Sequence, residues 1–178
     1  MPARAVSRWP PDADLPPWPD FADSAAALDT KRLGKQRVET LQIVRALTWP
    51  KYGWKNHPAV LMWRGYEEAL GAYGVAICAE WTTRGFGDTC EATMTIDLAT
   101  AGITAPPRSQ AELAALGLLP PWLGDDELHR SHRSALVRKD PEFYAAAFAD
   151  ADPEQPYVWP VRSIDLRDAE EKAQTQRR

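Results

Sequence analysis

One carboxylate lies inside a group of cations near the start of the chain. The segment reads LDTKRLGKQRVE, and it contains the cations Lys31, Arg32, Lys35 and Arg37 followed by Glu39. Cations attract phosphates, so a surface that only binds nucleic acid gains nothing from a lone acid among them. A carboxylate in this setting can instead take or give a proton, or stabilise a developing cation. The residue types therefore point to chemistry at Glu39.

The spacing of these residues predicts a shared helix face. Arg32, Lys35, Gln36 and Glu39 follow the series i, i+3, i+4, i+7, which a helix places on one side. On that side the basic groups can hold phosphates on either side of the carboxylate. The plainer interpretation is a solvated ion pair between Lys35 and Glu39, worth only a few tenths of a kcal/mol. Spacing alone favours the plainer interpretation, because such pairs are common on helices.

A second group of candidates lies in a loop that its prolines and glycine predict. Aromatic residues alternate there with lysines, the mixture expected where bases stack and phosphates are paired. The alternative is that these aromatic rings only cover the edge of the core. The candidate DNA-binding residues of this segment are Lys51, Tyr52, Trp54, Lys55, His57 and Arg64.

A third group follows an acidic stretch late in the chain. Its candidate DNA-binding residues are His129, Arg130, His132, Arg133 and Lys139. Two histidines three apart on a helix can face one metal ion, but zinc takes three or four protein ligands and the chain has only one other histidine. We therefore favour phosphate contact and expect no metal. Metal-dependent hydrolysis at these histidines stays a less favoured alternative.

The distribution of charge fits a local anionic partner. The formal net charge of -4 argues against a protein that coats nucleic acid indiscriminately. Residues 31–64 nevertheless carry eight lysines and arginines against one acid. Separate basic clusters in an acidic chain predict a limited binding footprint.

Length and composition favour a single domain in a reducing compartment. The 178 residues suffice for one sizeable core. No apolar run approaches the roughly 20 residues of a membrane span, and the proline-rich start lacks the apolar part of a secretory signal. Cys78 and Cys90 make neither a disulfide framework nor a paired metal motif. We expect a cytoplasmic monomer that does not contact membranes, with both thiols in or near the core.

The elements that must position these residues are predicted to be helices, which makes the fold all-α. We expect a proline-rich arm over residues 1–16, a compact helical domain over 17–162 and a polar tail over 163–178. Two long helices should pack together, with Trp63 and Trp81 in the core. Gly34 either allows the close approach of a ligand or another helix or is a glycine that the helix merely tolerates. The helices are expected from 23 or 24 to 48, 59 to 83, 110 to 116, 125 or 126 to 139, and 141 to 148, with a loop from 84 to about 109.

Three blocks of the chain resemble one known family. They are Leu28–Glu39, Ala79–Phe86 (AEWTTRGF) and His129–Pro141 (HRSHRSALVRKDP), which occur in order within residues 18–160. Together they are similar to the bacterial relatives of the phage pyrimidine dimer DNA glycosylase, endonuclease V. The resemblance implies a compact all-helical domain that acts on damaged double-stranded DNA, with no cofactor and with a displaced base.

The resemblance also implies catalytic roles. Glu39 matches the glutamate of the family, and the nucleophile of the family is the N-terminal α-amine, which attacks the sugar C1′ and forms a Schiff base. An amine with a pKa of about 8 is partly uncharged near neutrality, which suits this role. Trimming of Met1 would leave the secondary amine of Pro2 as that nucleophile. We expect an N-glycosylase with abasic-site lyase activity; the alternative is a non-catalytic nucleic-acid-binding protein on the same scaffold.

The chain departs from the family pattern around the glutamate. Val38 stands where the family has an arginine, and Gln42 stands where a second arginine is expected. The segment Pro17–Phe21 resembles a part that lies close to the start of the family's chain, so this chain has extra residues before that part. These differences bear on the choice of lesion and on the position of the terminal amine.

Overall fold

The computed structural model describes residues 16–160, and this part of the chain folds into eight α-helices without a strand. The predicted all-α class is confirmed. The predicted tail at 163–178 lies outside the described residues, as does the predicted arm apart from its last residue. In chain order the helices are α1 (Phe21–Ala27), α2 (Thr30–Thr48), α3 (Pro58–Leu61), α4 (Glu67–Thr83), α5 (Cys90–Thr100), α6 (Gln110–Ala115), α7 (Asp126–Lys139) and α8 (Pro141–Tyr144).

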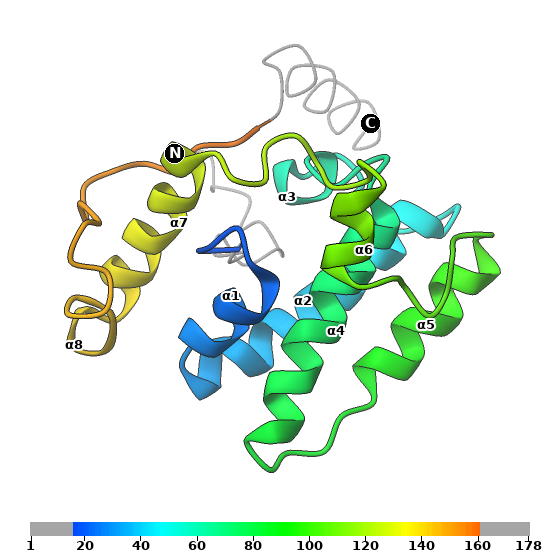
Figure 1. Ribbon diagram of the computed structural model, residues 1–178, viewed down its shortest axis with the longest axis horizontal. Helices are drawn as coiled ribbons and strands as arrows, with labels where there is room; N and C mark the ends of the chain where they lie inside the picture. The colour runs from blue at the N-terminus through cyan, green and yellow to red at the C-terminus, as the bar shows by residue number, and fades with distance from the viewer. Residues whose placement is uncertain (1–15, 161–178) are drawn as a thin grey trace, which may run out of the picture.

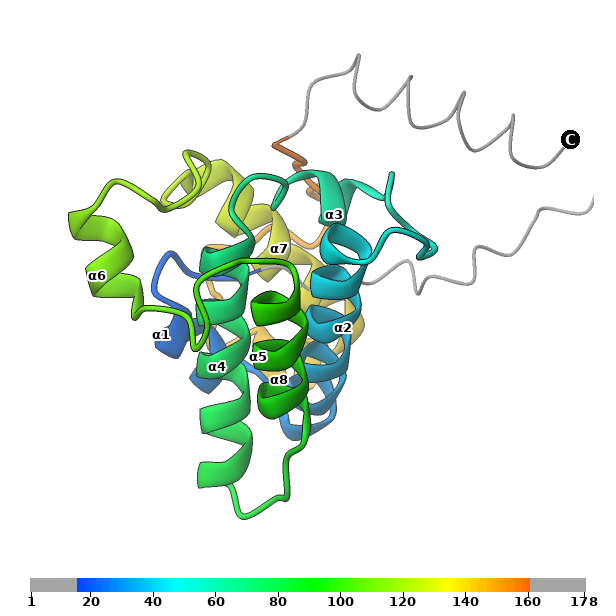
Figure 2. The ribbon, with the colours of Figure 1, turned by 90° about the vertical axis from the view of Figure 1, so that its right-hand side faces the viewer.

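Helices α2, α4 and α5 form the centre of the domain. They run side by side in two perpendicular views (Figures 1 and 2), and each packs against the other two. Gly74 of α4 lets them approach closely, because a Cβ there would lie 2.7 Å from Met94 of α5 and 3.1 Å from Thr40 of α2. The expected packing of the first two long helices is therefore confirmed, with α5 as an unexpected third member.

The first predicted helix is in fact two helices. The prediction of one helix from Asp23 or Ser24 to Thr48 is wrong, because Leu28 and Asp29 have extended backbone between α1 and α2. Asp29 caps α2: its Oδ1 accepts a hydrogen bond from the backbone N–H of Arg32 at 3.0 Å. Its side chain also accepts from the hydroxyl of Tyr144 at 2.5 Å. These two bonds explain why the chain breaks and restarts here.

The second predicted helix is also interrupted. The chain leaves helical geometry between α3 and α4, where Gly65 has a φ of +87°. Only glycine adopts such a φ without strain, so the backbone turns at this point. Trp63, expected in the core, is completely buried just before the turn.

Helix α5 lies where the sequence predicted a loop. Threonine-rich segments have low helix propensity, which explains the error. Its core stripe is Cys90, Met94 and Leu98, at helical spacing. Within the helix, the hydroxyl of Thr95 donates to the carbonyl of Glu91, so a polar side chain finds its partner one turn back.

The later helices follow the prediction more closely. Helix α6 is within one residue of it, and α7 starts after Asp125, whose side chain caps the first turn. Helix α8 ends at Tyr144, four residues earlier than predicted. Helices α7 and α8 pack together on one side of the domain (Figure 1). None of the helices in residues 16–160 is long and apolar enough to cross a membrane.

Candidate active site

Glu39 is a buried carboxylate on the long helix α2. Its side chain is 4% exposed, and its Oε1 lies 3.6 Å from the Nζ of Lys35, which is itself 35% exposed. The pair expected at i,i+4 therefore forms, but the solvated surface pair of the plainer interpretation does not, because water barely reaches the carboxylate. A charge in such a place is costly to bury, and acids positioned in this way are candidates for proton transfer.

Two more members of the predicted face belong to the same surroundings. Gln36 is almost fully buried beside Glu39, on the preceding turn of α2. Arg32 is held by carboxylates from two elements, since its Nη1 lies 2.8 Å from Asp29 and 3.5 Å from Asp140 at the start of α8. The guanidinium also lies 5.7 Å from the centre of the Tyr144 ring. Arg32 therefore holds α2 against the α7–α8 side of the domain.

The other two cations of the segment differ from each other. Lys31 is exposed at the first turn of α2. Arg37 points to the opposite side and pairs with Asp88 at 2.5 Å, with its guanidinium 4.8 Å from the centre of the Trp81 ring. The carboxylate of Asp88 raises the pKa of Arg37, and the pair fixes α2 to the loop between α4 and α5. Lys31 and Lys35 thus remain as the cations of this group that face solvent.

The aromatic loop after α2 is folded onto the protein. Tyr52 and Trp54 pack against the core, which favours the interpretation that they cover its edge. The Nζ of Lys55 donates to the carbonyl of Trp49 at 2.5 Å, and Arg64 donates to the carbonyl of Lys55 at 3.1 Å.

Two further loop residues have different roles. Lys51 is exposed. His57 caps α3, because its Nδ1 accepts from the backbone N–H of Ala59 at 3.1 Å. Burial lowers the pKa of His57 to about 4, so the ring is neutral and can accept this bond. The loop therefore offers its lysine rather than its rings to a partner.

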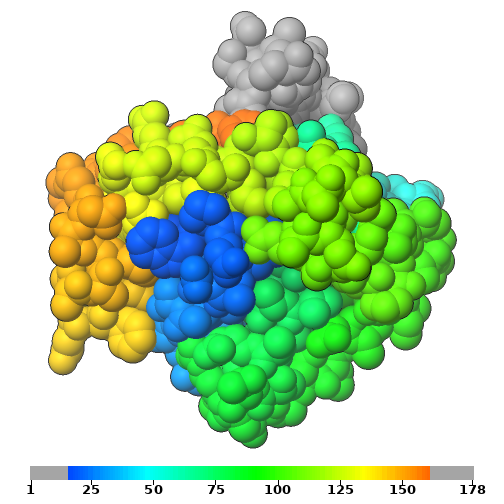
Figure 3. Space-filling model, in the orientation of Figure 1, coloured from blue at the N-terminus to red at the C-terminus, as the bar shows by residue number. Residues whose placement is uncertain are grey.

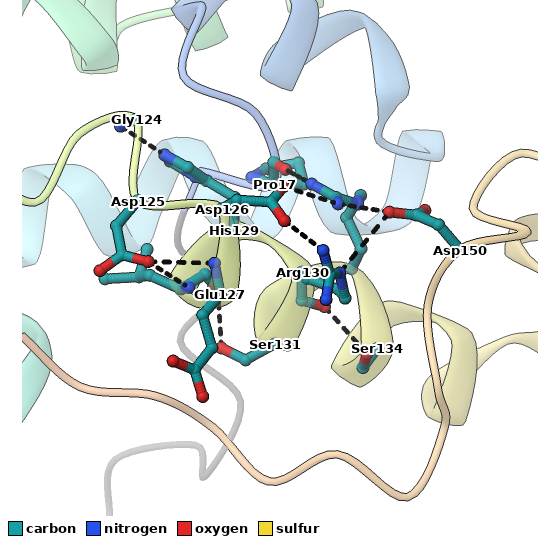
Figure 4. Close-up of polar contacts among 12 residues, drawn as sticks. Pro17, Gly124, Asp125, Asp126, Glu127, His129, Arg130, Ser131, Ser134 and Asp150 are labelled. Atoms are coloured by element: carbon teal, nitrogen blue, oxygen red, sulfur yellow. Dashed lines mark hydrogen bonds and ion pairs between the residues drawn. The ribbon is translucent and has the colours of Figure 1, made fainter.

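The predicted third group is largely internal. His129 and Arg133 on α7 are buried and hold the start of the described chain: His129 Nδ1 donates to the carbonyl of Pro16 at 2.7 Å, and Arg133 donates to that of Pro17 at 3.0 Å. Figure 4 shows His129 on α7 between Pro17 and Gly124. Arg133 also donates to Asp150 at 2.6 Å. In Figure 3 the same segment, coloured blue, lies between α7 and α6 on the surface.

The remaining members of this group also contact the protein itself. His132 is fully buried near the rings of Tyr157 and Trp159, and burial lowers its pKa to about 3. Arg130 pairs with Asp126 on the same helix, whereas Lys139 lies half-buried in the last turn of α7. Within residues 16–160, no cluster of three or more potential metal ligands is present. Most of this group is therefore engaged inside the protein and does not form the exposed phosphate-binding surface that the sequence predicted.

Sequence reasoning missed the acids that hold the arginines. Asp29 stands three residues before Arg32, which is the spacing of a helix cap and could have been recognised. Asp88 lies 51 residues from Arg37, and nothing in the sequence links the two. The same limit applies to Asp150, the partner of Arg133.

The fold and the site together define an all-helical domain that carries a buried carboxylate beside solvent-facing lysines on one helix. Such a domain is suited to acid–base chemistry on an anionic substrate. The model of the family described as pyrimidine dimer DNA glycosylase matches residues 7–94, so this part of the chain is similar to that family. The matched part contains α1–α4 and the first turn of α5, including Glu39. No curated protein and no solved structure matches the chain.

Proposed function

We propose that this protein is a DNA repair enzyme that removes a pyrimidine dimer or another damaged base and then cleaves the DNA strand as an abasic-site lyase. The observation that carries the proposal is the burial of Glu39 beside Lys35 on α2, within the part of the chain that matches the family. A carboxylate shielded from water can exchange a proton with a bound substrate without competition from solvent.

The N-terminal amine is the proposed nucleophile. In its uncharged form the nitrogen attacks the sugar C1′, the bond from C1′ to the base breaks, and the base leaves with the electron pair and takes up a proton. The amine nitrogen then loses its proton, the C1′–O4′ bond breaks with O4′ taking up a proton, and a cationic Schiff base between the amine and the opened sugar remains. Removal of a proton from C2′ then allows elimination of the 3′ phosphate. Pro2, the terminal residue after trimming of Met1, lies outside the described residues.

Glu39 is the proposed acid–base group for sugar ring opening and elimination. Lys31, Lys35 and Lys51 are solvent-facing cations that can contact DNA phosphates. Arg32 and Arg37 already pair with carboxylates, so we assign them to holding α2 in place rather than to the DNA.

Replacement of Glu39 by glutamine tests the proposal. The substrates are a UV-irradiated duplex and a duplex with one abasic site, scored separately for base release and strand cleavage. We expect Glu39→Gln to lower the cleavage rate at least 100-fold while duplex affinity stays within about threefold. Glu142→Gln, an exposed glutamate on α8, is the matched control and should cleave at the wild-type rate. Wild-type protein that binds the duplexes but releases no base would instead identify a non-catalytic nucleic-acid-binding protein.

Borohydride trapping tests the nucleophile. Reduction during reaction with the abasic duplex should give a covalent complex, and peptide mapping should locate the link on the N-terminal peptide. Intact-mass measurement shows which residue carries the free amine. A link on a lysine side chain would overturn the assignment of the terminal amine.

A further inference from the structure

Phe86 presents an aromatic ring to solvent at the turn between α4 and α5. Its side chain is 41% exposed and lies between Gly85, which has a φ of +93°, and Gly87. A single exposed ring is common on protein surfaces and by itself indicates nothing. The surroundings of this ring are what distinguish it.

The ring of Phe86 rests on a fixed support. It stacks on Trp81 with 4.3 Å between the ring centres and 24° between the planes. The indole N–H of Trp81 donates to the carbonyl of Gly87 at 2.9 Å, which fastens the turn to the ring. On α2, Gly34 leaves so little space that a Cβ there would lie 2.9 Å from the indole. Trp81 is thus held in place, and it presents Phe86 with one face toward solvent.

This support adjoins the exposed side of α2. Gly34 and Glu39 are five residues apart, so they lie about 140° apart around the helix axis. The exposed residues Lys31 and Val38, together with the partly exposed Lys35, lie between these two directions. A ligand that follows the exposed side of α2 therefore has Glu39 at one flank and the aromatic support at the other.

Two acids on either side of Phe86 in the sequence, Glu80 and Asp88, are each paired with a cation. The carboxylate of Asp88 is paired with Arg37 at 2.5 Å, and that of Glu80 is paired with Arg84 at 2.8 Å. Each of these acids is offset by a cation, whereas Lys31 on the adjoining side of α2 faces solvent.

We propose that Phe86 is a base-stacking contact: its free face stacks on a nucleobase of the damaged duplex that lies along α2. This inference rests on the proposed function in one respect, which is that the ligand is DNA. One ring beside lysines is far too small for a stable protein interface, which needs about 1,000 Å². It matches one unstacked base, since aromatic side chains inserted at a base step hold open a distorted duplex.

The experiment measures binding rather than turnover. The probe is a duplex with one tetrahydrofuran abasic analogue, which the lyase cannot cleave, opposite a fluorescent 2-aminopurine. We expect Phe86→Ala to weaken binding of this duplex about tenfold, with smaller effects on an intact duplex and with the 2-aminopurine fluorescence less quenched. Phe86→Trp should restore both signals. Ile96→Ala, which removes an exposed apolar side chain from α5, should behave as wild type.

The possible outcomes separate the two proposals. Phe86→Ala protein that binds the abasic duplex as tightly as wild type, with unchanged fluorescence, overturns the base-stacking contact even where the enzyme is active. If the wild-type protein cleaves no substrate but its DNA binding depends on Phe86, the base-stacking contact is supported and the proposed enzymatic activity is overturned. Wild-type protein that binds no duplex overturns both. Circular dichroism of each variant shows that the fold is intact.

Discussion

At Gly34, α2 lies close to the Trp81 ring. Alanine there places a Cβ 2.9 Å from the indole, whose position is fixed by the Phe86 ring and by its bond to Gly87. The better helix propensity of alanine should stabilise the folded protein by about 1 kcal/mol, whereas overpacking against the indole should destabilise it by about 1–3 kcal/mol. We expect Gly34→Ala to lower the free energy of unfolding by about 1 kcal/mol, measured by urea denaturation.

Gly53 supplies the control for this substitution. A Cβ at Gly53 would meet no atom within 4 Å, and the residue does not need a positive φ. Gly53→Ala should change the free energy of unfolding by less than about 0.5 kcal/mol. Equal effects at the two positions would show that the contact with Trp81 does not limit the size of residue 34.

Charge type and spacing identified the site only in part. The shared face of Lys35, Gln36 and Glu39 follows from helical spacing, and the structure confirms that Lys35 and Glu39 form a pair. Spacing could not tell that the carboxylate is buried, because burial depends on the elements that cover α2. It also could not separate Lys31, which faces solvent, from Arg37, whose partner Asp88 comes from the distant loop between α4 and α5.

At the scale of elements, Asp29 decides where α2 begins and how it meets α8. Asp29→Ala removes the helix cap and leaves the hydroxyl of buried Tyr144 without its acceptor. The cap contributes about 1 kcal/mol, and an unsatisfied buried hydroxyl costs about 1–3 kcal/mol more. We expect a loss of about 2–4 kcal/mol in the free energy of unfolding, with Asp29→Asn recovering the share that belongs to the cap.

A second aspartate cap allows a direct comparison. Asp20 caps α1 in the same way, accepting from the N–H of Asp23 at 2.8 Å, but it is exposed and makes no bond to Tyr144. Asp20→Ala should therefore cost only about 1 kcal/mol. If the two alanine variants are equally stable, the bond between Asp29 and Tyr144 contributes nothing measurable.

The errors in the predicted elements have identifiable causes. The break at Asp29 was missed because apolar periodicity continues across it, although aspartate three residues before Arg32 is a cap signal. Gly65 is a signal for the break before α4. The apolar residues on both sides of Gly65 have helical spacing, which favoured one continuous helix. Helix α5 was missed because its threonines suggested a loop, while its core residues Met94 and Leu98 stood at helical spacing. Long periodic helices were predictable, but their interruptions depend on single residues.

At the scale of the whole molecule, histidine burial makes stability depend on pH. The chain has three histidines, and burial lowers the pKa of each: His57 to about 4, His132 to about 3, and His129 to below its usual value. The unfolded chain takes up protons near pH 6.5, while the folded chain does not. Stability is therefore complete above about pH 7 and falls as the pH drops toward these lowered values.

The expected size of this effect is large enough to measure. With two to three more protons bound in the unfolded chain, the free energy of unfolding should fall by about 3–4 kcal/mol per pH unit near pH 5.5. His57→Asn keeps an acceptor for the N–H of Ala59 but removes one titrating group, so its slope should be smaller by about 1.4 kcal/mol per pH unit. Urea denaturation between pH 7.5 and 5 gives both slopes. Identical slopes would exclude His57 as a source of the dependence.

The contacts of Pro16 and Pro17 show that the part of the chain that matches the family is not structurally independent of the rest. The family match ends at residue 94, yet the side chains that hold this entry segment come from later in the chain, on α7. The backbone N–H of Phe21 likewise donates to Gln110 of α6. A shortened protein that ends at residue 94 would keep Glu39. It would lose the hydrogen bonds that α6 and α7 make to residues 16–21. Residues beyond the matched part therefore hold Pro16, Pro17 and Phe21 in place.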